Sequence, residues 1–149
     1  MAKTTPMDVL RDLADKTLSE TTAELGKVQQ LYSKAFSQLG ELENYEQEYQ
    51  QQMQAAIVSK GMSVINLIAH SAFIDSLNNV VKQHALHVAA CQDSVDRTMQ
   101  VWRKDKQRLN AFETLKSRAN SIRELKENRL EQKMMDEFAQ RASLRKGDV

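Results

Sequence analysis

The sequence predicts an all-α protein in which two long helices form an antiparallel coiled-coil hairpin and the C-terminal helix overhangs its partner. The 149 residues include only 4 Gly and 1 Pro, and aromatic residues make up 5%, so turns are few and core material is sparse. One strong turn signal, at residues 60–63, separates two helical stretches. A bulky apolar residue also returns at every seventh position, as along a coiled-coil seam, at Leu67, Ile74, Val81, Val88, Val95, Trp102 and Leu109.

The first helix is expected over about residues 5–60. Thr5 can cap it, Pro6 suits the first helical position, and Asp8 places a negative charge near the positive helix end. The seam of this helix advances in alternating steps of three and four residues through Ala14, Leu18, Thr21, Leu25, Val28, Tyr32, Ala35, Leu39, Leu42, Glu46, Tyr49, Met53 and Ala56.

In the turn, at about residues 60–63, Gly61 can adopt the left-handed conformation that ends a helix, and Ser63 can cap the next one. The second helix is expected over about residues 63–145, and residues 1–149 are expected to form a single coiled-coil domain. At about 1.5 Å per residue, the helices are roughly 80 Å and roughly 120 Å long. Pairing mirrored about the turn therefore uses up the first helix near Lys116.

The part of the second helix beyond Lys116 still carries an apolar face, which has no partner within the chain. Two occupants remain open: a helix of a second copy, or the cavity of a partner protein. The apolar positions follow helical spacing and are Leu115, Ala119, Ile122, Leu125, Leu130, Met134, Phe138 and Ala142, with Met135 beside them.

Charge is unevenly divided along the chain. Residues 1–100 carry a net charge of −4 and residues 101–149 a net charge of +5. Acidic residues interleave with the basic ones in the tail, which favours an acidic protein surface over nucleic acid or an anionic membrane. A single cysteine, Cys91, fits a reducing compartment, and no apolar run has the length of a signal peptide or a membrane span. We therefore expect a cytoplasmic protein that does not insert into the membrane.

The motifs of nucleotide hydrolysis and acyl transfer are missing from the sequence. It contains no G-x-x-x-x-G-K-[ST], no G-x-G-x-x-G and no glycine-flanked serine, so we expect neither enzyme activity nor a cofactor. His84, His87 and Cys91 follow helical steps of three and four residues, and zinc accepts these ligand atoms. A fourth ligand is lacking, and His84 and Cys91 fall at seam positions, so we predict no metal site.

Several segments resemble the FliJ family of flagellar export proteins, and the similarity spans nearly the whole chain. The most specific are ENRLEQK at residues 127–133 and MDEFAQRA at residues 135–142. Residues 10–16, 43–49 and 102–109 fit the same family, whereas residues 50–72 match only loosely.

The resemblance implies a component of the bacterial flagellar type III export apparatus. Members of this family form a long antiparallel coiled coil that enters the hexameric ring of the flagellar export ATPase. They also contact the cytoplasmic domain of the membrane-embedded export gate and associate with export chaperones. Such a protein is cytoplasmic and is peripherally associated with the inner membrane through the export apparatus.

The resemblance also assigns roles to individual positions. The residues implied in binding the ATPase ring are Leu10, Leu13, Leu130, Met134, Met135, Phe138, Arg141 and Ala142. Those implied in binding the export gate are Phe73, Leu77, Val80 and His84, which fall on one helical stripe; a smaller residue can stand at the position of Val80. Leu77 and His84 are also seam positions, so internal packing is the alternative explanation for both.

Our hypothesis is a non-catalytic stalk whose C-terminal helix and N-terminal helix end plug the ATPase ring, promoting its assembly or activity, while the hairpin end reaches the gate. One alternative is an export chaperone or escort that holds cargo chaperones on its apolar stripes. A second is the equivalent stalk of a virulence type III secretion system. A third is a purely structural homodimeric coiled coil.

Overall fold

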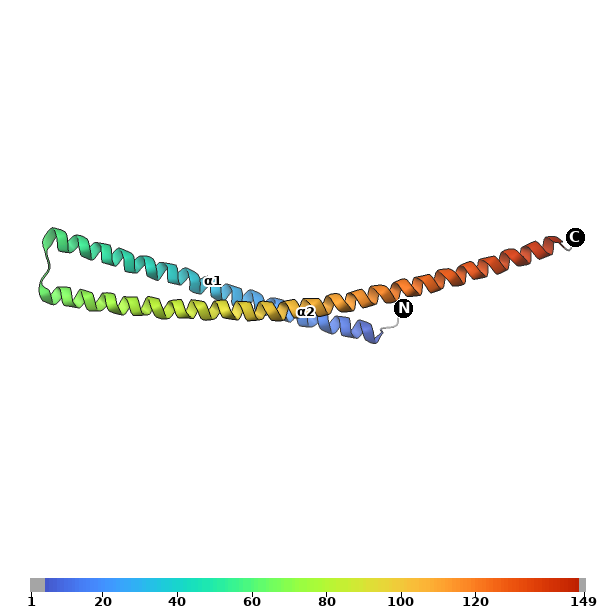
Figure 1. Cartoon of the computed structure of the whole chain (residues 1–149), viewed down its shortest axis with the longest axis horizontal. Helices are drawn as coiled ribbons and strands as arrows, with labels where there is room; N and C mark the ends of the chain where they lie inside the picture. Colours follow the sequence, from blue (N-terminus) through green and yellow to red (C-terminus); the bar gives the residue numbers. More distant parts are fainter. Residues whose placement is uncertain (1–4, 148–149) are drawn as a thin grey trace. The chain divides into compact units, whose positions relative to one another are not determined.

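The computed structural model describes residues 5–147, and within that range the chain forms two helices and no strand (Figure 1). Helix α1 spans Pro6–Lys60 and has 55 residues, and α2 spans Val64–Gly147 and has 84. The two helices pack antiparallel, which confirms the predicted fold class. Residues 1–4 and 148–149 of the expected domain lie outside the described range.

The start of α1 is a reciprocal capping arrangement. The backbone N–H of Asp8 donates to Thr5 Oγ1 (3.2 Å), and the backbone N–H of Thr5 donates to Asp8 Oδ2 (3.2 Å). The Thr5 N–H thereby gains a partner, and the Asp8 N–H, which also donates to the Thr5 carbonyl (3.0 Å), gains a second acceptor. Pro6 occupies the first helical position, where the missing N–H costs nothing.

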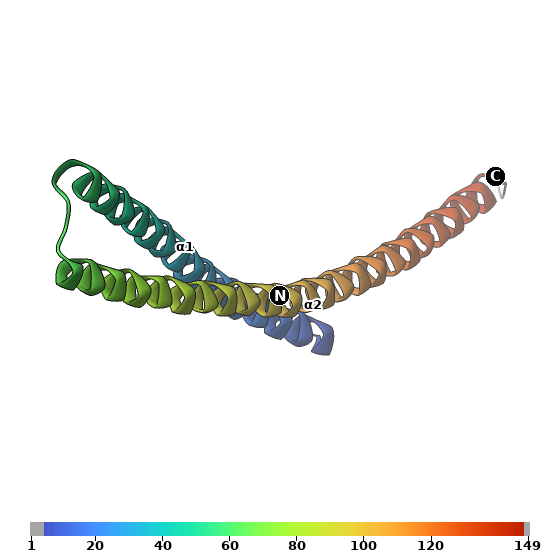
Figure 2. The same ribbon diagram turned by 60° about the vertical axis from the view of Figure 1, so that its left-hand side comes forward.

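A short turn of residues 61–63 connects the two helices (Figure 2). Gly61 has a φ of 69°, a left-handed conformation that residues with a Cβ rarely adopt, and its N–H donates to the carbonyl of Ile57 (3.1 Å). Ser63 then caps α2, because its Oγ accepts from the N–H of Asn66 (3.3 Å). Helix α2 continues to Gly147, past the expected end near residue 145, and basic Arg145 and Lys146 suit its last turn.

Contacts divide the chain into two compact units. The turn unit is Ser19–Lys104, and the described part of the terminal unit comprises residues 5–18 and 105–147. In the turn unit the core is thin: the buried side chains are Leu25, Ala35, Leu77 and Val88. The predicted α1 positions in this unit, from Thr21 to Ala56, are all buried or half-buried. The seven-residue column also faces inward here, except at Leu67, which is 42% exposed.

In the terminal unit, the two helices pair only as far as Lys116. Ala14 of α1 and Leu109 of α2 are buried, while Arg11 contacts Glu113 (3.5 Å) and Asp8 contacts Lys116 (2.9 Å). Every residue from 117 to 147 is exposed. We call this segment the tail. Its exposure confirms that α2 overhangs α1 beyond Lys116.

Candidate protein-interaction surfaces

The tail presents a continuous apolar stripe to solvent. Leu130, Met134, Phe138 and Ala142 recur at every fourth position, so they lie along one side of α2. Met134 is 64% exposed and Phe138 is 77% exposed, and these two side chains line a shallow hollow together with Met135. Methionine and phenylalanine supply adaptable apolar contact area, which suits a surface that binds another protein.

Basic side chains accompany the end of the stripe. Arg141 and Arg145 line a second shallow hollow together with Phe138 and Ala142. No acidic residue occurs between Ala139 and Gly147. The last turns of α2 therefore combine apolar and cationic groups, an arrangement that suits an acidic protein surface.

The start of α1 forms a separate apolar patch. Val9, Leu10 and Leu13 are each about half exposed. Between Lys116, which lies opposite the first turn of α1, and Leu130, α2 rises roughly 20 Å. The structure therefore does not bring Leu10 and Leu13 into one patch with Leu130 and the residues that follow it, although all of them belong to the terminal unit.

The Asp8 carboxylate contacts both Lys116 and Thr5 at the start of α1. Its hydrogen bond to the Lys116 ammonium, together with those from the backbone and hydroxyl of Thr5, lowers the pKa of the Asp8 carboxyl to about 2. The carboxylate is thus charged over the whole neutral range. Its two oxygens hold the first turn of α1 and attach that turn to α2.

The four residues assigned to the export gate by resemblance do not share one accessible surface. Val80 is 47% exposed and Phe73 is 43% exposed. Leu77 is buried, and His84 Nε2 donates to the backbone carbonyl of Ala35 (2.9 Å). Leu77 and His84 therefore occupy seam positions that hold α2 against α1.

Phe73 belongs to an aromatic cluster near the turn. Its ring lies 4.7 Å from the ring of Tyr49, centroid to centroid, and the Tyr49 hydroxyl contacts Nδ1 of His70. These contacts join α1 to α2 where no aliphatic side chain is fully buried. The sequence identified Tyr49 as a seam residue but gave no indication of its two aromatic partners.

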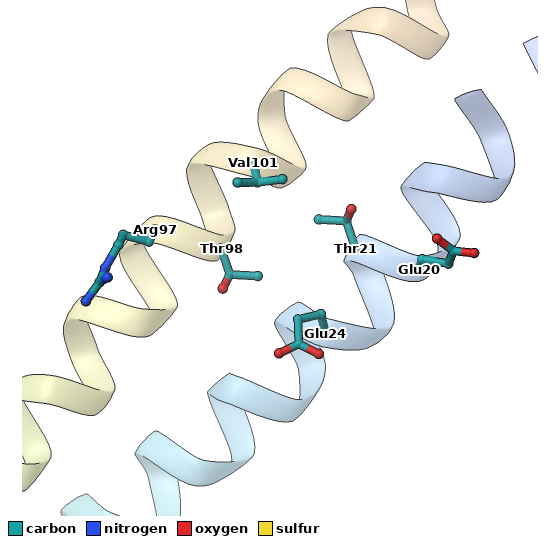
Figure 3. A pocket seen from close by; sticks show the side chains of 6 residues that line it. All are labelled: Glu20, Thr21, Glu24, Arg97, Thr98 and Val101. Atoms are coloured by element: carbon teal, nitrogen blue, oxygen red, sulfur yellow. The ribbon is translucent and has the colours of Figure 1, made fainter. Parts of the chain in front are cut away.

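A polar stretch interrupts the core of the turn unit (Figure 3). Thr21 and Thr98 face each other between the helices, with Val101 beside them, while Glu20 and Arg97 point outward. Threonines supply little apolar area at seam positions, so packing is weaker here than at Leu25 or Val88. One turn further, Trp102 Nε1 donates to Thr22 Oγ1 (2.9 Å), which satisfies the indole N–H.

The side chains of His84, His87 and Cys91 make contacts within the protein. His84 Nε2 is bonded to the Ala35 carbonyl, and Cys91 Sγ lies 3.7 Å from His87 Nε2. Among residues 5–147, no three histidine, cysteine or acidic side chains are arranged to hold a metal ion. Nor does any helical segment in this range combine the length and apolarity needed to cross a bilayer.

Sequence reasoning recognised Asp8 as a capping charge but missed its ion pair with Lys116. The signal was available, because mirrored pairing about Gly61 had already placed the end of α1 opposite Lys116. The hydrogen bond of Trp102 was missed as well. Its position in the seven-residue column indicated packing, but not which α1 side chain would accept from the indole.

Comparison with known proteins gives two concordant results. A family model described as "Flagellar FliJ protein" matches residues 3–148. A flagellar FliJ protein of Salmonella typhi is 36% identical over 146 residues, covering 98% of this chain and 99% of that protein. A flagellar FliJ protein of Escherichia coli strain K12 is also 36% identical over the same shares of both chains.

Proposed function

Since the chain belongs to the family of flagellar FliJ proteins, we propose that it is a non-catalytic stalk of the flagellar type III export apparatus. The tail, together with the N-terminal end of α1, inserts into the hexameric export ATPase and promotes its assembly or activity. The turn end links the ring to the cytoplasmic domain of the export gate. The flagellar relatives favour this assignment over the equivalent stalk of a virulence system.

The observation that carries the proposal is the exposed tail. Residues 117–147 bury none of their apolar side chains, although Leu130, Met134 and Phe138 form an ordered stripe. Exposed apolar area costs roughly 25 cal/mol per Å² relative to burial, so a partner that covers the stripe gains affinity. A ring cavity offers a single exposed helix a surface against which this stripe can be buried.

Charge supports an acidic lining of that cavity. The tail presents Lys133, Arg141, Arg145 and Lys146 alongside its apolar stripe. These cations pair with acidic loops of the ring, and Met135 adapts to its contours. Leu10 and Leu13 then meet the rim of the ring, because the start of α1 lies opposite Lys116, well before the stripe begins at Leu130. The stalk contributes no catalytic group and needs no cofactor.

The gate contact is proposed for the stripe of Phe73, Leu77, Val80 and His84. Phe73 and Val80 provide the accessible contact area. Leu77 and His84 act indirectly, by holding α2 against α1 beneath that area. The protein is cytoplasmic, and this contact associates it peripherally with the inner membrane. It does not itself insert into the bilayer, and it does not bind nucleic acid.

A second candidate function is favoured by exposed apolar groups on α1. Leu31, Phe36 and Tyr45 are each more than half exposed on α1 in the turn unit. They suit an escort that binds export chaperones. In that case, binding maps to α1 and does not depend on the tail.

The two functions are separated by a pull-down coupled to an ATPase assay with the purified hexameric export ATPase. Truncation after Ser117 removes the tail but leaves the whole α1 pairing intact. We expect the truncated chain to lose ring binding and ATPase stimulation while it retains chaperone binding. Unchanged stimulation by the truncated chain would rule out the tail as the ring-binding element.

A further inference from the structure

The terminal unit has two different lateral sides, and an ion pair identifies one of them. Arg11 lies three residues before buried Ala14, and Glu113 lies four residues after buried Leu109. Their contact places these two flanks on the same side of the helix pair. Helical spacing continues this polar side along α2 in steps of three and four residues, through Glu113, Ser117, Asn120, Glu124, Glu127 and Glu131.

The opposite side is apolar. It begins on α1 with Leu10, four residues before Ala14, and continues with Leu13; both are about half exposed. On α2 it begins with Phe112, three residues after Leu109. The steps alternate between three and four residues, as in a coiled-coil seam, and give the row Phe112, Leu115, Ala119 and Ile122. We call this row the second seam.

The second seam is distinct from the seam that pairs the helices. Leu109 is only 5% exposed, because α1 covers it, whereas Leu115 is 45% exposed and Ile122 is 55% exposed. A row with regular three-and-four spacing is suited to knobs-into-holes packing with another helix. Together with Leu10 and Leu13, it offers two ridges between which a third helix can lie.

Charge specifies the third helix. Continued with the same steps, the second seam meets basic residues at both of its ends: Arg108 before it, and Lys126, Arg129 and Lys133 after it. The acidic residues Glu124, Glu127 and Glu131 belong to the polar side instead. Cations at the ends of an apolar seam attract a helix that carries acidic residues, and they repel a basic one.

We propose that the second seam docks an acidic amphipathic helix of a partner protein, forming a three-helix arrangement on the terminal unit. Together with the basic residues at its ends, the second seam extends roughly 38 Å from Arg108 to Lys133, so the docked helix spans about four heptads. This inference adds a binding site to the proposed function. The two share Leu10, Leu13 and Lys133, but the second seam itself, from Phe112 to Ile122, ends before the ring-contact stripe begins at Leu130.

The experiment uses the full chain and a synthetic probe. The probe is a fluorescent peptide of about four heptads with leucine on its seam and glutamate at the flanking positions. A matched peptide carries lysine instead of glutamate. Fluorescence anisotropy should show saturable binding of the acidic peptide, weakening at high salt, and at least tenfold weaker binding of the basic peptide, on the order expected from reversing several rim charges.

Variants locate the peptide on the surface. Ile122→Glu should weaken binding by more than about tenfold, because it places a charge in the seam. The double variant R108E/K126E should weaken it by about tenfold. Glu124→Gln lies on the polar side and should change binding by less than about twofold. All these positions are exposed, so circular dichroism should show unchanged helix content.

Several results would overturn the proposal. They are absence of peptide binding, equal binding of both peptides, and equal weakening by Glu124→Gln and Ile122→Glu. The proposal would also be overturned if the isolated chain sediments as a dimer and Ile122→Glu converts it to a monomer. The helix that covers the second seam would then belong to a second copy of the chain. Because the assay contains no ATPase, these outcomes leave the ring proposal untouched, and failure of ring stimulation leaves this one untouched.

Discussion

Lys116 Nζ lies 2.9 Å from Asp8 Oδ1, and this contact attaches the first turn of α1 to the last paired turn of α2. The same carboxylate caps α1 through its other oxygen, which accepts from the N–H of Thr5. One side chain thus both begins a helix and fixes where the helix pairing ends. The length of the free tail depends on this position.

The first prediction concerns acid. Because Lys116 and Thr5 lower the Asp8 pKa from 3.8 to about 2, the contact is fully formed above the ordinary value and is lost as the pH falls toward 2. An NMR titration of the Asp8 carboxyl should give a midpoint near 2, and Lys116→Met should move it upward. Asp15→Asn, on an exposed part of α1, should leave the Asp8 midpoint unchanged. An Asp8 midpoint that is insensitive to Lys116→Met would contradict the assigned cause.

The second prediction concerns the indole of Trp102. Thr22→Val removes the acceptor of the Nε1 hydrogen bond while retaining the volume of the side chain. It should lower the free energy of unfolding by about 1 kcal/mol and shift the tryptophan emission. Thr22→Ser retains the hydroxyl and is the control for the loss of a methyl group. Equal effects of the two substitutions on the emission would show that the hydrogen bond is unimportant.

The third prediction compares two leucines of α2. Leu109 is 5% exposed beneath α1, whereas Leu125 is 55% exposed in the tail. Leu109→Ala should lower the free energy of unfolding by about 2 kcal/mol, near the low end for buried leucines because the core is thin. Leu125→Ala should change it by less than about 0.5 kcal/mol. Urea denaturation followed by circular dichroism measures both values, and similar losses would mean that the tail is covered in solution.

Much of the fold could be predicted from the spacing of residues in the sequence. The α1 positions from Ala14 to Ala56 were predicted by spacing alone and all face inward, because a regular seam needs only a partner of similar period. Gly61 was identified because few residues tolerate its left-handed conformation. Leu67 was expected to pack but is 42% exposed, since the α1 positions that mirror it about the turn are Ala55 and Ala56, which are too small to cover it.

The candidate surfaces were less predictable than the fold. The exposed stripe from Leu130 to Ala142 followed from helix lengths, which leave it without a partner. For the stripe that contains Phe73 and His84, spacing alone did not predict which residues are exposed. One helical stripe can include both residues that pack in the seam and residues that face solvent. Leu77 and His84 turn inward, whereas Phe73 and Val80 do not. Only the register of the two helices decides which side each residue takes.

The fourth prediction separates direct from indirect effects at the proposed gate contact. Val80→Glu adds a charge on the exposed side and should weaken binding to the purified cytoplasmic domain of the gate by about tenfold or more, without changing the melting temperature. Leu77→Ala should lower the melting temperature as well, because Leu77 is buried. If Val80→Glu binds as well as the wild type, the gate contact lies elsewhere.

The fifth prediction tests which side of the tail meets the ATPase ring. Phe138 and Met134 lie on the apolar stripe, whereas Leu125 falls on nearly the opposite side of the same helix; all three are more than half exposed. Phe138→Ala should therefore leave the free energy of unfolding within about 0.5 kcal/mol of the wild type, because it removes no internal contact. If Phe138 anchors the tail in the ring, its truncation should weaken ring binding by roughly thirtyfold, the size expected for a central aromatic contact.

Leu125→Ala is the matched control and should retain wild-type ATPase stimulation. Equal losses for the two variants would indicate that the ring contacts the tail without regard to its apolar side, and the proposed stripe would then be wrong.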